Sequence, residues 1–194
     1  LKNVLIINGH QKWDGFSEGK LSKSINKKVS EVLKGKFNIN YSFVDQDYEI
    51  SEEIQKIKNA DIVIYNFPIF WMGSPWKFKK YIDEIFMNGR DILFESDGRT
   101  RENPDAENYG NGGLCQTKKF MIISSMNAPE GSFGKGNFFD GDFDKLVFWL
   151  IKNNHWIGIR NQYPSHVFYD VVKNPTIEQG MLELEEKLNL IQYN

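Results

Sequence analysis

Residues 61–76 have the sequence DIVIYNFPIFWMGSPW, and this stretch decides the predicted fold. After Asp61 its first residues are apolar and mostly β-branched, which is typical of a strand buried on both faces of a parallel sheet. The chain then enters a loop rich in aromatic residues. Ser74 and Pro75 follow as a good N-cap and a favoured first-turn proline of a helix. A buried strand that leads through a loop into a helix is the repeating unit of an α/β fold.

The same alternation extends in both directions along the chain. Buried strands are predicted at residues 4–9, 39–44, 61–65, 120–125 and around His166–Tyr169. Helices are predicted at residues 18–34, at 51–58, from Ser74, at 143–152 and from Asn174. Strands that alternate with helices form a parallel sheet with right-handed crossovers. We therefore predict an α/β fold with a five-stranded parallel sheet of order 2-1-3-4-5.

Composition narrows the classes of function. The chain has 194 residues, 40% of them hydrophobic and 26% charged, which predicts one globular domain over residues 1–194. The net charge is −2 and the basic residues are scattered, so nucleic acid is excluded as the main partner. Cys115 is the only cysteine, which excludes an internal disulfide and a cysteine-rich metal site.

The chain lacks the patterns of a membrane protein. Its longest purely apolar run, Leu146–Ile151, is far shorter than the roughly 20 residues that span a bilayer. The first residues already form a predicted strand, and no signal peptide is visible. The sequence therefore predicts a cytoplasmic protein without a membrane span.

A segment at about residues 88–117 departs from the α/β alternation. It has little periodicity and is interrupted by Gly98, Gly110, Gly112 and Gly113. Long loops in compact domains are functional or disordered. Because Phe94, Tyr109 and Leu114 offer anchors, we predict an ordered active-site or interface excursion, with a disordered loop as the alternative.

Ligands of open parallel sheets bind beyond the carboxyl ends of the strands, where the strand order reverses. In the predicted order, three loops meet there: His10–Glu18, Phe67–Ser74 and Met126–Gly136. All three are rich in glycine, proline, hydroxyl or aromatic residues. We therefore predict the ligand site at this edge.

The first loop has the features of a phosphate site. Ser17-Glu18-Gly19-Lys20-Leu21 combines a hydroxyl, a glycine that permits close backbone approach and the start of a helix, and Ser24 adds a second hydroxyl. The alternative is that Ser17 only caps the helix. The loop matches neither a P-loop nor a G-x-G-x-x-G fingerprint.

The second loop indicates a flat aromatic ligand. Phe70, Trp71 and Met72 can pack on a flavin ring while their backbone N–H groups reach its polar edge. The alternative is that they belong to the core. The third loop, Ser125–Pro129, turns through Asn127 and Pro129, and its alternative is an ordinary turn.

Other patterns of catalytic chemistry are absent from the sequence. His10, His155, His166 and Cys115 lack metal-ligand spacing, so no metal is predicted. Asp83 and Glu84 fit the solvated face of a helix, and no G-x-S-x-G elbow occurs. An organic cofactor is therefore the favoured carrier of the reaction.

The motifs resemble one known family. The chain is similar to the modulator of drug activity B family, flavodoxin-like FAD-dependent NADPH:quinone reductases that are distantly similar to DT-diaphorase. The resemblance covers nearly the whole chain and rests on Asn8-Gly9, Ser17-x-Gly19-x-Leu21, Pro68-x-x-Trp71-Met72-Gly73-x-Pro75-Trp76, Lys79–Asp83, Ser96–Arg101, Tyr109-Gly110-x-Gly112-Gly113-Leu114 and Asn127-Ala128-Pro129.

This resemblance implies a flavodoxin-like three-layer sandwich, FAD rather than FMN as the cofactor, NADPH as the electron donor, and a quinone or similar small aromatic acceptor. It also implies a homodimer, because active sites of this fold commonly lie between subunits. Carried over by position, the cofactor-binding residues are Ser17, Glu18, Gly19, Lys20, Leu21, Ser22, Lys23, Ser24, Ile69, Phe70, Trp71, Met72, Tyr109, Ser125, Met126, Asn127 and Ala128.

The proton donor is not identified by the motifs. Tyr109, water and His155 are the candidates, with Tyr109 a weak one. Relatives have Gly-Trp in place of Ile69-Phe70 and Thr-Trp in place of Ser125-Met126. These departures lie beside the expected ring site and bear on substrate preference. Rival functions are a flavodoxin-like electron carrier, a regulatory flavoprotein subunit and an FMN-dependent azoreductase-type enzyme.

Overall fold

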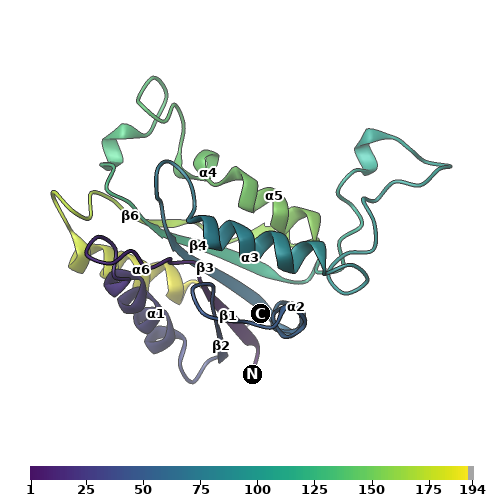
Figure 1. Ribbon diagram of the computed structural model, residues 1–194, viewed down its shortest axis with the longest axis horizontal. Coiled ribbons are helices and arrows are strands. Elements are labelled where there is room, and N and C mark those ends of the chain that lie inside the picture. The colour runs from purple at the N-terminus through teal and green to yellow at the C-terminus, as the bar shows by residue number, and fades with distance from the viewer. Residues whose placement is uncertain (192–194) are drawn as a thin grey trace.

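The computed structural model describes residues 1–191 and contains a parallel sheet between two layers of helices (Figure 1). The sheet order β2-β1-β3-β4-β5 confirms the predicted order 2-1-3-4-5. The helices and strands, in chain order, are β1 (Asn3–Asn8), α1 (Lys20–Leu33), β2 (Asn38–Phe43), α2 (Ile50–Asn59), β3 (Ile62–Pro68), α3 (Trp76–Met87), η1 (Ala106–Asn108), β4 (Lys119–Ser125), η2 (Glu130–Ser132), α4 (Phe143–Leu146), α5 (Phe148–Trp156), β5 (Asn161–Gln162), β6 (His166–Phe168) and α6 (Ile177–Asn189).

Alternation of side chains along the strands gives the sheet its two buried faces. Val4 and Ile6 of β1 pack with the apolar stripes of α1 and α6. Leu5 and Ile7 of the same strand pack with α2, α3 and α5 on the opposite face. Both faces are therefore covered, as the uninterrupted apolar strands require. This arrangement confirms the predicted three-layer sandwich.

The fifth position of the sheet differs from the prediction. Instead of one strand around His166–Tyr169, two short strands, β5 and β6, both pair with β4, so the sheet has six strands. Pro164 lies between them and has no backbone N–H to donate. The break at this proline explains the division.

Two predicted helices also need correction. The segment predicted as one helix over 143–152 forms α4 and α5, separated at Val147, whose φ of −104° and ψ of 18° are not helical. The third helix begins at Trp76 with Pro75 in the N-cap position, so Ser74 does not cap it as predicted. Pro75 is extended there, with φ −53° and ψ 140°.

The excursion at 88–117 is a paired stem that carries a protruding tip (Figure 1). Its two sides are joined by backbone hydrogen bonds from Leu114 N–H to Leu93 O and from Glu95 N–H to Gly112 O, both 2.8 Å long. At its base Leu93 is fully buried. The stem begins just after α3 ends, so it lies at the opposite end of α3 from the loop that follows β3.

Within residues 1–191, no helix has the length and apolar character needed to cross a membrane. The cytoplasmic location stays a prediction from the sequence.

Candidate functional site

The candidate site is a cavity of about 540 Å³ at the carboxyl edge of the sheet. Loops that follow β1, β3, β4 and β6 meet there, as the strand order requires. Its lining consists of His10, Gly15, Phe16, Ser17, Glu18, Gly19, Lys20, Leu21, Ser22, Pro68, Ile69, Phe70, Ser125, Met126, Asn127, Val171 and Val172. Most of the predicted cofactor-binding residues therefore lie around one cavity.

The remaining predicted residues lie outside this lining. Lys23 and Ser24 belong to the first turns of α1, and the Ser24 hydroxyl donates to the Lys20 carbonyl at 3.1 Å. Trp71 and Met72 form the exposed tip of the loop after β3, beyond the cavity wall. Ala128 is half-buried directly after the third loop segment.

Tyr109 is the predicted residue that lies farthest from the cavity. It belongs to the excursion, where its ring packs on Trp156 at a centroid distance of 5.0 Å. The Arg99 guanidinium lies over the same ring, with Cζ 5.3 Å from the ring centroid. Trp156 ends α5, away from the cavity. His155, the other candidate proton donor, precedes Trp156 and is likewise absent from the cavity lining.

The amino end of α1 faces the cavity and gives it the character of an anion site. Gly19 occupies the N-cap position with φ +76°, in the left-handed region that favours glycine. Within the described chain, no side chain caps this helix and no acidic residue stands in its first turn. The first backbone N–H groups, of Lys20, Leu21 and Ser22, are therefore available to an anion, and the helix dipole favours one.

The alternative in which Ser17 caps this helix is wrong. The Ser17 hydroxyl lies 3.1 Å from His10 Nε2, and α1 starts three residues after Ser17. The sequence placed His10 in the first predicted loop but did not include it among the cofactor-binding residues. Its place in the first loop, directly after a buried strand that ends in Asn8-Gly9, was the signal for a site residue.

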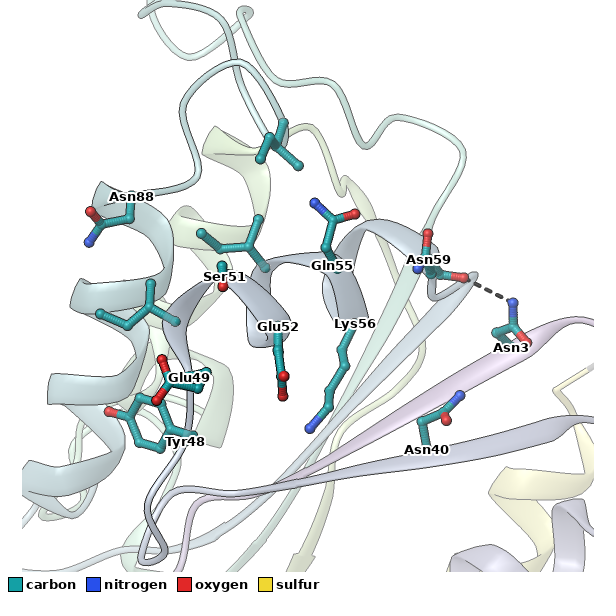
Figure 2. Close-up of a pocket in the computed structure, with 13 residues that line it drawn as sticks. Asn3, Asn40, Tyr48, Glu49, Ser51, Glu52, Gln55, Lys56, Asn59 and Asn88 are labelled. Atoms are coloured by element: carbon teal, nitrogen blue, oxygen red, sulfur yellow. Dashed lines mark hydrogen bonds between the residues drawn. The ribbon is translucent and has the colours of Figure 1, made fainter.

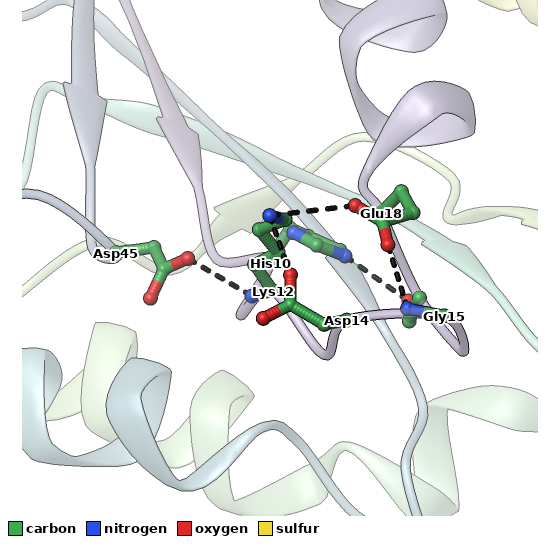
Figure 3. A network of polar contacts seen from close by, with 7 residues as sticks. His10, Lys12, Asp14, Gly15, Glu18 and Asp45 are labelled. Carbon is green, nitrogen blue, oxygen red and sulfur yellow. Dashed lines mark hydrogen bonds and ion pairs between the residues drawn. The ribbon is translucent and has the colours of Figure 1, made fainter.

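A network of polar contacts fixes the shape of the first loop (Figure 3). The Lys12 backbone N–H donates to Asp45 Oδ2 at 2.9 Å, and the Gly15 N–H donates to Glu18 Oε1 at 2.7 Å. The Lys12 ammonium lies 2.5 Å from Asp14 and 3.6 Å from Glu18. These contacts hold the loop around the His10 ring and direct Ser17 and Gly19 toward the cavity.

The electrostatic surroundings of His10 are mixed. Burial lowers the pKa of the imidazole, while the Asp45 carboxylate and Glu18 act in the opposite direction. Asp45 itself is held by the Lys77 ammonium at 2.6 Å. Burial is the largest of these influences, so the pKa of His10 lies below its ordinary value.

The loop after β3 is a tight two-residue hairpin. Phe70 and Gly73 exchange backbone hydrogen bonds of 2.8 and 3.1 Å, and both residues between them have positive φ, 47° for Trp71 and 62° for Met72. Turns of this kind prefer Asn-Gly because side chains are strained there, by about 1 kcal/mol or more per residue. The turn nevertheless holds the Trp71 side chain 98% exposed, beside the cavity. Strain that presents an exposed indole is typical of a binding site.

The third loop closes the cavity by backbone pairing. The Ser125 carbonyl accepts from Ile69 N–H at 2.8 Å, and Met126 N–H donates to the Phe168 carbonyl at 2.9 Å. Met126 is buried and anchors this loop in the core. The role of the loop in cofactor binding stays a prediction. The loops after β3, β4 and β6 are thus tied together at this edge.

A larger groove, about 1080 Å³, lies beside α2 (Figure 2). Its lining combines Ile50, Ile54 and Ile92 with polar side chains that include Glu49, Glu52 and Lys56. The Asn59 carbonyl accepts from Asn3 Nδ2 at 3.0 Å. The first turn of α2 contains Glu52 and Glu53, so carboxylates already lie beside the amino end of this helix. This groove therefore lacks the chemistry of an anion site.

The described residues contain no group of three or more His, Cys, Asp or Glu side chains placed to hold a metal ion. The cavity at the carboxyl edge instead fits a flavin. The uncapped start of α1 suits a phosphate, and Gly19 lets this backbone lie against His10, because a Cβ there would come within 2.9 Å of the ring. Ile69 and Phe70 provide an apolar wall for the ring.

Comparisons with known proteins agree with this geometry. Residues 2–189 match the family described by a flavodoxin-like fold. The chain is 38% identical over 192 residues to the NADPH:quinone oxidoreductase MdaB of Haemophilus influenzae, covering 97% of this chain and 98% of that protein.

Two solved structures share the fold. One is a Klebsiella pneumoniae protein described as a candidate quinone reductase, with a TM-score of 0.79 and 17% identity over 100% of this chain and 86% of the other. The second is an FMN-dependent NADH-azoreductase from Bacillus anthracis in complex with FMN, with a TM-score of 0.71 and 16% identity over 98% of this chain and 99% of the other.

Proposed function

This chain belongs to the flavodoxin-like fold family, in the modulator of drug activity B group that its motifs indicate, and we propose that it is a flavin-dependent NAD(P)H:quinone oxidoreductase. One observation carries the proposal. The uncapped amino end of α1, headed by Gly19, opens into a cavity whose next wall is the aromatic hairpin after β3. A phosphate site beside an apolar slot is the combination that a flavin nucleotide requires.

In this proposal, different residues of the cavity bind the phosphates and the ring of the flavin. The N–H groups of Lys20, Leu21 and Ser22 and the Ser17 hydroxyl hold the phosphates. Ile69 and Phe70 cover the ring, while Trp71 and Met72 form the outer rim on the side that meets the substrate. The Trp71 and Met72 N–H groups, which take no part in the pairing of Phe70 with Gly73, would face the polar edge of a bound flavin ring and stabilise negative charge there.

When bound, the flavin supplies two-electron chemistry, in which a hydride equivalent passes from NAD(P)H to a quinone. The protein contributes binding, orientation and exclusion of water. A donor and an acceptor that both reach a bound flavin past the exposed Trp71 would occupy the same place in turn, so alternating occupancy is the expected kinetic scheme.

We propose FAD as the flavin and NADPH as the donor, with FMN as the alternative cofactor. The match of 38% over nearly the whole chain to an NADPH:quinone oxidoreductase supports the donor. The motif resemblance supports FAD. The cavity extends past the start of α1 to Val171 and Val172, which offers an apolar surface for the part of FAD that FMN lacks.

We further propose a homodimer in which Tyr109 acts in the site of the second copy. Tyr109 is 59% exposed on an excursion that projects away from the body of its own chain (Figure 1). Within one chain it lies at the far end of α3 from the cavity, so contact with flavin needs another subunit. Exposed aromatic residues at the carboxyl edge, such as Phe16 and Trp71, suit burial in such an interface.

A visible absorption spectrum tests the proposal. The purified protein, supplied with FAD, is titrated with NADPH without oxygen and then with a quinone. We expect the flavin bands to bleach without a long-wavelength radical band and to return when the quinone is added. A protein that takes up neither FAD nor FMN would contradict the proposal, and a stable radical band would favour the electron carrier.

A further inference from the structure

The His10 side chain lies between Gly19 at the start of α1 and Phe70 of the hairpin after β3. Its ring lies directly under Gly19, where an added Cβ would come 2.9 Å from Cε1 and Nδ1. Its edge faces Phe70 at a centroid distance of 6.4 Å and an interplanar angle of 75°. The backbone holds the residue in place, because the His10 N–H donates to Asn8 Oδ1 at 3.0 Å. The imidazole therefore contacts both parts of the proposed flavin site.

Either His10 Nε2 or the Ser17 hydroxyl can be the donor in the hydrogen bond between them, and an anion bound at the start of α1 favours one of these two directions. The Ser17 hydroxyl has one proton, and it donates this proton to an anion only if His10 Nε2, 3.1 Å away, donates to the hydroxyl oxygen. The opposite direction, with the hydroxyl donating to Nε2, presents no proton to the cavity. An anion at the start of α1 therefore favours a proton on Nε2, which both the neutral Nε2–H tautomer and the imidazolium supply.

Charges of both signs face the ring. Asp45 after β2 and Glu18 before α1 favour the imidazolium, whereas Lys23 of α1 disfavours it. Lys77 of α3 and Lys12 both contact Asp45 and reduce its influence. The amino end of α1 adds a positive partial charge. An anion bound there offsets this positive charge and the cost of burial, so it shifts His10 toward the protonated form.

We propose that His10 is a positioning residue that turns the Ser17 hydroxyl toward the flavin phosphates and takes up a proton from solvent when the flavin binds. The inference rests on the proposed function and adds a regulation to it: flavin affinity depends on pH. No bond other than N–H forms, and the proton comes from the buffer. Ser17 contacts Nε2 of the ring, and Gly19 lies against Nδ1 and Cε1. Among the described residues, His10 is also the only histidine that lines the cavity.

Calorimetry on the full-length apoprotein tests this. FAD is titrated at about pH 7 in two buffers with different ionisation enthalpies, and the affinity is measured at about pH 6 and about pH 8.5. FAD is a useful probe because its phosphates keep a fixed charge over this range. We expect net proton uptake and an affinity about tenfold higher at the lower pH, since each unit of pKa shift corresponds to about tenfold in affinity.

His10→Gln separates positioning from titration. The glutamine amide can donate to Ser17 but does not titrate, so we expect binding near the wild-type level at about pH 8.5, with no proton uptake and a flat pH profile. Ser17→Ala removes the hydroxyl and should weaken binding by about fivefold at both pH values. His155→Gln is the matched control: this half-buried histidine lies near the end of α5, outside the cavity lining, and its loss should leave the pH dependence of FAD affinity unchanged.

A second measurement does not depend on variants. The chain has three histidines, so each imidazole can be followed by NMR, and the His10 pKa should be higher with FAD bound than without it. An unchanged His10 pKa, absence of proton uptake, or a His10→Gln profile as steep as wild type would overturn the inference. Protein that binds no flavin at any pH would instead contradict the proposed function.

Discussion

The amino ends of α1 and α2 line two different hollows of the molecule, and they differ in how their charge is compensated. α1 starts at Gly19 without an acidic residue in its first turn and faces the cavity of about 540 Å³. α2 has Glu52 and Glu53 in its first turn and lines the groove of about 1080 Å³. The larger hollow thus has a helix end that is already neutralised. Chemistry at the helix end, rather than volume, distinguishes the ligand site.

The largest expected loss of flavin affinity comes from Gly19→Ala, and Gly35→Ala is its matched control. Both glycines have positive φ, +76° and +80°, so alanine costs about 1 kcal/mol of stability at either place. Only at Gly19 does the added Cβ meet another group, the His10 ring. We expect flavin affinity to fall about 100-fold for Gly19→Ala and less than about twofold for Gly35→Ala. Fluorescence titration with FAD measures both, and equal losses would remove the distinction.

Reversing the charge of each helix end tests the comparison directly. Lys20→Glu places a carboxylate in the first turn of α1, which should stabilise the apoprotein by about 0.5 kcal/mol and weaken flavin binding about tenfold. Glu52→Lys should lower the stability by a similar amount, about 0.5 kcal/mol, and leave flavin affinity unchanged. Thermal unfolding and FAD titration give the two quantities. A loss of flavin affinity in Glu52→Lys would mean that the α2 groove takes part in binding.

A smaller effect on flavin affinity is expected at the hairpin after β3. Trp71→Ala removes the exposed indole of the hairpin, and we expect flavin affinity to fall about fivefold while the far-UV circular dichroism stays nearly unchanged. Trp76→Ala is the control, because this tryptophan is also exposed, at 58%, but belongs to the first turn of α3. Equal retention of flavin by both variants would remove Trp71 from the site.

The smallest effect on flavin is expected at the α2 groove. The Tyr48 hydroxyl lines it and donates to Glu84 Oε2 at 2.5 Å. Tyr48→Phe should lower the free energy of unfolding by about 1 kcal/mol through the lost hydrogen bond and change flavin affinity by less than about twofold. Urea unfolding and FAD titration would show whether the two regions are independent.

The sheet order and most of the cavity lining could be predicted from sequence because both depend on local patterns. Apolar runs such as Val4–Ile7 identify buried strands, and the order of strands decides which loops meet. That order predicted the loops His10–Glu18, Phe67–Ser74 and Met126–Gly136, and the family resemblance supplied the individual residues Ser17 to Ser22, Ile69, Phe70 and Ser125 to Asn127. The modest errors at Pro75, Val147 and Pro164 concern where elements break, which neighbouring packing decides.

Other features depend on contacts that no local pattern contains. The positive φ values of Trp71 and Met72 are against the residue preferences of such turns, so the hairpin could not be read from sequence. His10 was missed because its role comes from Gly19 and Ser17 closing around it. The position of Tyr109 depends on the direction in which the excursion leaves α3.

The cavity at the carboxyl edge takes its walls from four segments spread between His10 and Val172, which is most of the chain. One ligand there contacts the loops that follow β1, β3, β4 and β6, which come together only in the folded chain, so it binds the folded protein and not the unfolded one. At a concentration 100 times its dissociation constant, a ligand adds about 2.7 kcal/mol to stability. Degradation in a cell often follows the small unfolded fraction. The supply of flavin would thus set the lifetime of this polypeptide as well as its activity.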